Sequence, residues 1–204
     1  PSEQTIPKVA ELSIPPLNIR YVPTISYREY FSTGVRYHPE FATFLRQNGS
    51  HQQQTEAWGG HFEILGFVHT FSQLLPPERY FAEHPEWYTD PARGSLPCTK
   101  DSTMPDGQKT QLCLSNLEVL KELTKNALEL IGENPEAGYI SISQNDYTAN
   151  CHCADCQKIA QKEGSESGPI LKFVNAVAAE IGQQYPRFWV ESMAYTYSEK
   201  PPKT

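Results

Sequence analysis

The chain has 204 residues, 38% of them hydrophobic and 20% charged, with a net charge of −7. This length suits one globular domain, with room for a smaller addition. The sequence excludes a transmembrane helix, because no apolar run approaches the roughly 18 residues of a membrane span. The basic residues are scattered, which argues against nucleic acid as a partner. The chain begins with Pro1 and carries no secretory signal, so we expect a piece of a longer protein.

Prolines recur in residues 1–23 and predict an extended, Pro-rich arm or linker. Beyond the arm, apolar periodicity alternates between the two kinds of regular element. The predicted strands are 24–30, 62–70, 111–114, 138–143 and 188–195. The predicted helices are 38–47, 76–88, 116–131 and 168–185. The helix over 116–131 has the clearest periodicity, with Ser115 as its expected N-cap and Gly132 as its expected stop.

Alternating strands and helices predict an α/β fold with a mainly parallel sheet. About five strand–helix units fall short of a complete eight-fold barrel, which needs roughly 250 residues. We therefore predict a partial (β/α) TIM-barrel-like sheet over residues 24–204, with an open doubly wound sheet as the alternative. Neither a GxGxxG fingerprint nor a Walker-type phosphate loop is present, so nucleotide binding has little support. An opened barrel exposes sheet edges, for which we expect self-association.

Polar side chains follow several of the predicted strands, at the edge where parallel α/β sheets gather their functional groups. Asp146 comes directly after a strand and is placed to protonate a leaving oxygen or orient a substrate. Glu191 is the candidate second carboxylate, and His69, which ends an apolar strand, is the third candidate catalytic residue. An Asp at this point also suits a simple turn, and a strand-end His is often only structural.

Further residues are candidates for binding a sugar. Trp58 precedes two glycines in a polar loop and is a candidate platform for stacking on a sugar ring. The other candidates lie at or beyond the predicted strand ends and would hydrogen-bond sugar hydroxyls: Arg28, Asn145, Tyr195 and Tyr197.

The sharpest local motif is the CxCxxC run of Cys151, Cys153 and Cys156. Three soft ligands on one short loop suit tetrahedral Zn²⁺, and Cys113 is the first choice for a fourth ligand. Such a closed site would be structural. The sequence leaves two alternatives open, namely two disulfides with one free thiol, or five reduced thiols.

The chain closely resembles the DUF4838 family over about residues 20–203. The resemblance rests on blocks that follow one another in order: HTFSQLLPPERYFAEHPEWY, QLCLSNLEVL, ENPEAGYISISQNDYTANCHCADC, GPILKFVNAVAAEI and YPRFWVESMAYTYSEKPPK. It implies a glycoside-hydrolase type of TIM barrel, near α-glucuronidases and hexosaminidases. It also implies a carbohydrate substrate and a secreted or periplasmic bacterial parent protein.

Carried over residue by residue, the family's strand-end blocks fall on Arg28, His69, Asn145, Asp146, Cys151, Cys153 and Cys156. The chain departs from the family between residues 88 and 111, where an extra cysteine, Cys98, could pair with Cys113. The first hypothesis is therefore the N-terminal portion of a glycoside hydrolase barrel. The alternatives are a non-catalytic carbohydrate-binding module and a zinc-stabilised structural module, with a redox role for the CxCxxC run as a distant fourth.

Overall fold

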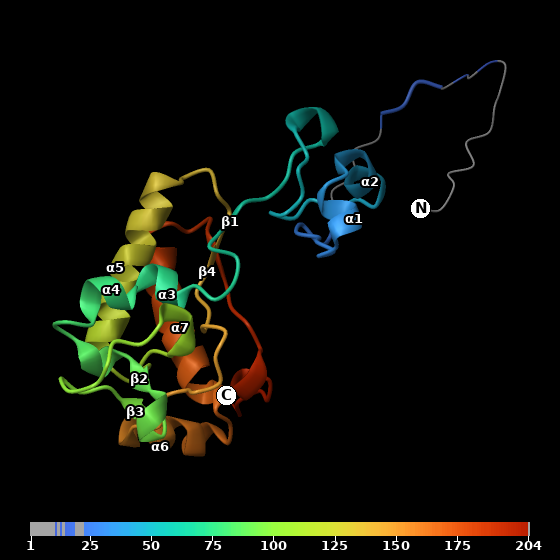
Figure 1. Ribbon diagram of the computed structural model, residues 1–204. Coiled ribbons are helices and arrows are strands. Elements are labelled where there is room, and N and C mark those ends of the chain that lie inside the picture. The colour runs from blue at the N-terminus through green and yellow to red at the C-terminus, as the bar shows by residue number, and fades with distance from the viewer. Residues whose placement is uncertain (1–10, 12, 14, 19–22, 204) are drawn as a thin grey trace.

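The computed structural model describes residues 11, 13, 15–18 and 23–203. Most of the predicted arm over residues 1–23 lies outside these described residues. Within them, the chain combines α-helices with a small parallel sheet, so the α/β class predicted from the sequence is confirmed. Figure 1 shows the sheet beside the long helices, with the segment that carries α1 and α2 set to one side.

The central sheet has three parallel strands in the order β1-β4-β5, namely Ile64–Leu65, Tyr139–Ser141 and Trp189–Glu191. Their register places Leu65 beside Ile140 and Ile140 beside Val190. Because neighbours in register share a face, Ile140 and Val190 point to one side, and Ser141 and Glu191 to the other. The sheet therefore has one apolar face and one with polar side chains.

Two long helices that the sequence predicted pack beside the apolar face: α5 (Leu117–Glu133) and α7 (Ser167–Gln184). A third helix, α6 (Ala154–Glu163), was not predicted and packs on α7. The N-cap of α5 is Asn116 and not Ser115, because the Asn116 side chain accepts hydrogen bonds from the backbone of Glu118 and Val119. Gly132 continues the helix where a stop was expected. A Cβ at Gly132 would lie 3.3 Å from the Tyr185 hydroxyl, so the glycine allows α7's end to pack closely.

The remaining elements are short. The α-helices are α1 (Thr33–Arg36), α2 (Pro39–Phe44), α3 (Phe71–Leu74) and α4 (Pro77–Tyr80). The 3-10 turns are η1 (Glu56–Trp58), η2 (Pro85–Trp87), η3 (Pro91–Arg93), η4 (Gly107–Lys109) and η5 (Thr196–Ser198). An antiparallel pair joins β2 (Thr89–Asp90) to β3 (Leu96–Pro97). Proline opens α2, as predicted, because its missing N–H is not needed in the first turn.

The predicted strands at 24–30 and 111–114 are wrong, and the five-unit barrel is not formed by the described residues. In the first segment, the Asn48 side chain takes the hydrogen bonds, accepting from the Arg28 backbone and donating to the Ser26 carbonyl. In the second, Leu112 forms only an isolated bridge with Tyr88. Alternating side chains do not make a strand where the backbone finds its partners elsewhere.

The apolar core lies between the sheet and the long helices. It joins Ile140 and Ile142 from β4 and its end to α5 and α7 through Leu123, Val177 and Ile181, all fully or almost fully buried. Residues 23–62 contact this body through Tyr139, whose ring packs on Tyr27 and Phe62 at centroid distances of 5.6 Å. Among the described residues, no helix has the length and apolar character needed to cross a membrane.

We expect Leu123→Ala to lower the free energy of unfolding by about 2–5 kcal/mol, because it leaves a cavity in a closely packed core. Leu117 is the matched control, since its side chain lies on the same helix with 78% of its surface exposed. Leu117→Ala should change the free energy by less than about 0.5 kcal/mol. Urea unfolding of the three proteins measures the difference, and equal losses would contradict this description of the core.

Candidate functional site

The end of β1 has an unusual backbone. Phe67 and His69 both have positive φ values, of 50° and 55°, although neither is glycine. Such conformations are strained and persist where the surroundings hold them, often at functional sites. Here His69 is held by a hydrogen bond from its Nδ1 to the Gln144 carbonyl at 2.9 Å. Because a carbonyl only accepts, Nδ1 carries a proton and is the donor in this hydrogen bond, which leaves Nε2 free to contact a ligand.

The end of β4 brings Asp146 next to the segment that follows β5. The Tyr195 hydroxyl donates a hydrogen bond to the exposed Asp146 carboxylate at 2.9 Å. The His69 ring meets the Tyr195 ring edge-on, with centroids 5.6 Å apart. Three predicted site residues, far apart in the sequence, therefore meet at the carboxyl edge of the sheet. Hydrogen bonding to Asp146 raises the pKa of the Tyr195 hydroxyl, which keeps it a donor.

Asn145, expected to bind substrate, is 1% exposed and uses its whole amide within the protein. Its Nδ2 donates to the carbonyls of Gly107 and Thr110, and its Oδ1 accepts from the Ser72 backbone. The role of Asn145 is therefore structural, because its amide fixes α3 and the loop around η4 beside Asp146.

Gln144 and Gln111 are supporting residues that the sequence reasoning did not single out. Gln144 is fully buried, donates to the Tyr195 carbonyl at 3.0 Å and accepts from the Ser198 hydroxyl at 2.6 Å. Gln111 joins the backbone of Asn145 through both ends of its amide. The signal available in the sequence was a polar SQN run directly after an apolar strand, where buried amides need partners.

Glu191 lies on the polar face of the sheet, opposite Ser141 in the register. Its Oε1 is buried and has no hydrogen-bond partner among the described residues. Burial raises the pKa of the Glu191 carboxyl, and a hydrogen bond with Ser141 offsets part of that effect. The protein therefore holds a carboxyl group here that loses its proton less readily than an exposed glutamate does.

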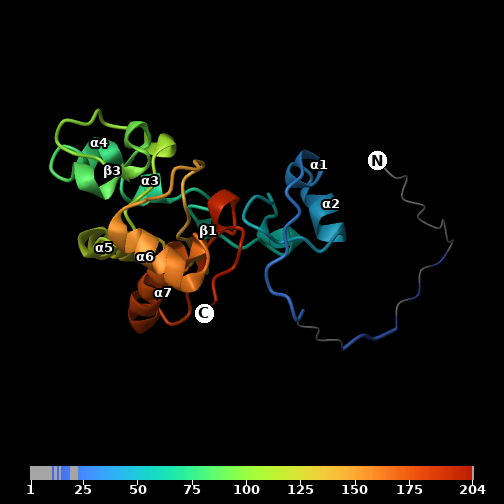
Figure 2. The same ribbon diagram turned by 90° about the horizontal axis from the view of Figure 1, so that it is seen from below.

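Arg28, Trp58 and Tyr197 do not join the group at the strand ends. Arg28 donates to the carbonyls of Arg46 and Ile25, within residues 23–62. Trp58 is half-exposed on η1 in the same segment, which Figures 1 and 2 show beside the main body. This segment reaches the end of β1 through Phe31 and His51, whose rings pack on Phe67. Tyr197 lines a small cavity beside the cysteines, and burial raises the pKa of its hydroxyl.

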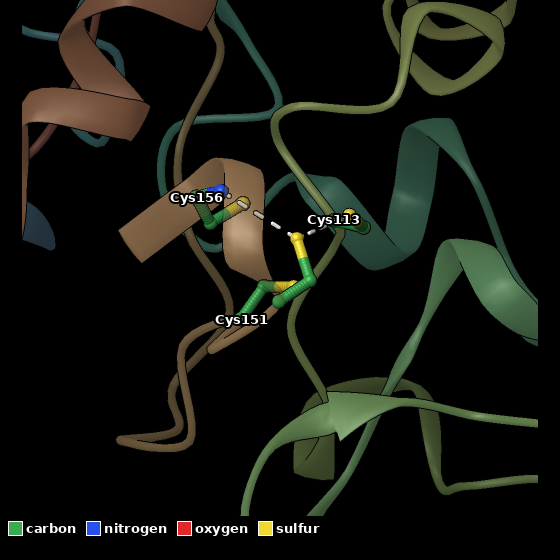
Figure 3. Close-up of side chains that lie close together, drawn as sticks. Cys113, Cys151 and Cys156 are labelled. Atoms are coloured by element: carbon green, nitrogen blue, oxygen red, sulfur yellow. Dashed lines mark hydrogen bonds between the residues drawn. The ribbon is translucent and has the colours of Figure 1, made fainter. Parts of the chain in front are cut away.

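The four predicted metal ligands lie together. The sulfurs of Cys113, Cys151, Cys153 and Cys156 are all within 4.8 Å of one another, and Cys113 Sγ and Cys153 Sγ are 3.7 Å apart. Figure 3 shows the sulfurs of Cys113, Cys151 and Cys156 directed toward one point. Cys153 is the N-cap of α6 and its sulfur accepts from the Cys156 backbone, while Ser115 contacts the sulfurs of Cys153 and Cys156. This arrangement can bind a metal ion.

The thiols of this cluster share their protons unequally. Hydrogen bonds with Cys151 and Cys156 hold the pKa of Cys113 far below its usual value. The same hydrogen bonds to Cys113 raise the pKa values of Cys151 and Cys156. Four thiolates at this spacing repel one another, so a cation is needed before all four can be deprotonated together.

Cys98 lies outside the cluster, in the main apolar core, where burial raises its pKa to about 11. All five cysteines, each within the described part of the chain, are free thiols. The pairing of Cys98 with Cys113 is therefore not present, and Cys113 lies with the CxCxxC run instead.

The fold and site define an α/β protein with polar side chains at the carboxyl edge of a parallel sheet and a four-cysteine cluster beside it. The chain belongs to the DUF4838 family, described as a domain of unknown function, which it matches over residues 1–204. A search of the curated proteins and of the solved structures found no match.

We expect Glu191→Gln to raise stability at pH 8, with a gain that shrinks as the pH falls toward the usual glutamate pKa of 4.5. The sign follows from linkage: a raised folded-state pKa stabilises the fold below the unfolded pKa, and this contribution is lost as the pH rises through the folded pKa. Urea midpoints at pH 5 and pH 8 measure the effect. Glu180→Gln, on an exposed part of α7, is the control and should show no such trend. A pH-independent difference for Glu191→Gln would contradict the assignment.

Proposed function

We propose that this chain is part of a glycoside hydrolase with a (β/α) barrel, and that it acts on a carbohydrate at the carboxyl edge of its sheet. The observation that carries the proposal is the meeting of His69, Asp146 and Tyr195 at that edge. The three side chains offer an imidazole nitrogen, a carboxylate and a hydroxyl donor. These are the groups that bind the hydroxyls of a sugar.

Two carboxyl groups in different surroundings support hydrolysis over binding alone. Asp146 is exposed and accepts from Tyr195, whereas Glu191 is half-buried, with its Oε1 atom buried, and the pKa of its carboxyl is raised. Glycosidases use such a pair, in which the carboxyl with the raised pKa protonates the leaving oxygen. We assign that role to Glu191, and to Asp146 the role of stabilising the developing positive charge or activating the attacking group. A non-catalytic sugar-binding module would need no group like Glu191.

The cysteine cluster fits structural zinc. Four thiolates at a Zn–S distance of about 2.3 Å form a tetrahedron with sulfurs about 3.8 Å apart, and Cys113 and Cys153 are separated by 3.7 Å. All four ligands come from the protein, so the ion would have no open position for substrate. When bound, zinc would crosslink the segment after Leu112 to the start of α6. We propose that zinc has this structural role. We also propose that the parent protein is secreted or periplasmic.

We expect the purified protein to carry one equivalent of zinc by elemental analysis. Cys156→Ser should lose the metal and unfold at a lower denaturant concentration, because three sulfurs leave the tetrahedron incomplete. Cys98→Ser is the matched control, as Cys98 is an equally buried thiol outside the cluster, and it should retain the full equivalent. Metal-free protein whose mass shows two disulfides would contradict the zinc site.

We expect the chain to cleave at least one member of a panel of nitrophenyl α- and β-glycosides, glucuronides and N-acetylhexosaminides included. Glu191→Gln should lower kcat/KM by about 10²–10⁴-fold, the usual contribution of a general acid, while saturation-transfer NMR still detects sugar binding. Asp146→Asn and Tyr195→Phe should weaken binding as well. Asp101→Asn, an exposed loop residue, is the control and should change neither. Sugar binding that both Asp146→Asn and Tyr195→Phe leave unaffected would contradict the proposed site.

A further inference from the structure

A groove separate from the strand ends runs between the start of α5, α6 and α7. Its cavity volume is about 580 Å³, within the roughly 300–1,000 Å³ range of small-molecule sites. Figure 2 shows α5, α6 and α7 lying next to one another on this side of the molecule. The floor is apolar and consists of Leu114, Leu120, Ile159, Phe173 and Ala176.

Three lysines surround this floor. Lys158 and Lys162 are one helical turn apart on α6, and Lys172 approaches from α7. None of the three forms an ion pair with a described residue. Asp155 is the only acidic residue lining the groove among the described residues. The chain as a whole has a net charge of −7, so this is a local excess of positive charge around an apolar surface.

The groove continues along the contact between α6 and α7. A second cavity of about 370 Å³ shares Ile159, Lys162 and Lys172 with the first and reaches Pro202 near the end of the chain. It also carries Glu163. The combined shape is therefore elongated, which suits a linear apolar chain better than a compact, polar molecule such as a sugar.

We infer that this groove binds a small amphiphilic carboxylate, with its alkyl chain on the apolar floor and its anionic end at the lysine ammonium groups. Burial of the alkyl chain supplies the driving force, at about 25 cal/mol per Å². The lysines can cover the chain with their methylene stems while keeping their charges in water. The charge selects an anion over a neutral or cationic ligand of the same length.

Three probes with a ten-carbon chain test the inference on the full chain: decanoate, decanol and decyltrimethylammonium, each below its micelle concentration. Displacement of anilinonaphthalene sulfonate fluorescence and calorimetry measure their binding. We expect decanoate to bind, decanol to bind at least about tenfold more weakly and the cation not to bind. The preference for decanoate should decrease as salt is added, because the lysines are exposed.

Matched variants locate the site. Ala176→Trp fills the groove and should weaken decanoate binding at least about tenfold, whereas Ala179→Trp, exposed on the same helix, should not change it. Lys158→Gln and Lys172→Gln should each weaken binding about three- to fivefold, in the range of an exposed ion pair. Lys121→Gln on α5 lies outside the groove and is their control.

Any of three results would overturn the inference. The first is equal affinity for decanoate and decanol, because the lysines would then have no role in binding. The second is decanoate binding that Ala176→Trp leaves intact, and the third is no decanoate binding at millimolar concentration. Because none of these variants touches His69, Asp146 or Glu191, the outcome is independent of the proposed hydrolase site.

Discussion

The carboxyl edge of the sheet depends on the hydrogen bonds that satisfy two buried side-chain amides, those of Gln144 and Asn145. The strands contain only two or three residues each, so the ladder between them supplies few hydrogen bonds. At the end of β4, Gln144 and Asn145 enter the interior, where an unpaired polar group costs about 1–3 kcal/mol. The partners that satisfy them belong to other segments: α3, the η4 loop and the turn after β5. The hydrogen bonds of these amides therefore bring the segments together at the carboxyl edge of the sheet.

This arrangement explains how buried hydrogen bonds fix the positions of the side chains in the candidate site. The backbone carbonyl of Gln144 accepts a hydrogen bond from the His69 ring, and its side-chain amide donates to the Tyr195 carbonyl. The strained φ of His69 is maintained by the same contact. Site residues supported in this way change position little when a ligand arrives, which favours preorganised recognition over induced closure. The cysteine cluster fixes the next segment along the chain, so both ends of the loop after β4 are anchored.

Much of the organisation could be predicted from the sequence, and the failures have physical causes. The 3.6-residue period identified α5 and α7 because a long amphipathic helix repeats its signal over several turns. The grouping of Cys113 with the CxCxxC run was also predictable, from soft ligands at close spacing. The alternating side chains of residues 24–30 predicted a strand that does not form, because the Asn48 side chain hydrogen-bonds the backbone of that segment. The burial of Asn145 and of the Tyr197 hydroxyl could not be predicted from the sequence, because the identity of a polar residue does not indicate whether it hydrogen-bonds water or protein.

The position of Cys113 has a consequence for how the chain folds. It lies 40 residues before Cys153, and the segment between them contains all of α5 and β4. An ion shared by the two would close this segment into a loop, a constraint that on the chain-entropy model removes roughly 3–5 kcal/mol of freedom from the unfolded state. The strand β4 must also find β1 across a long stretch of sequence, a slow search for a parallel sheet. Metal binding before β4 pairs with β1 would shorten the time that this pairing takes. The folding rate would therefore depend on whether the metal binds before or after the strands pair.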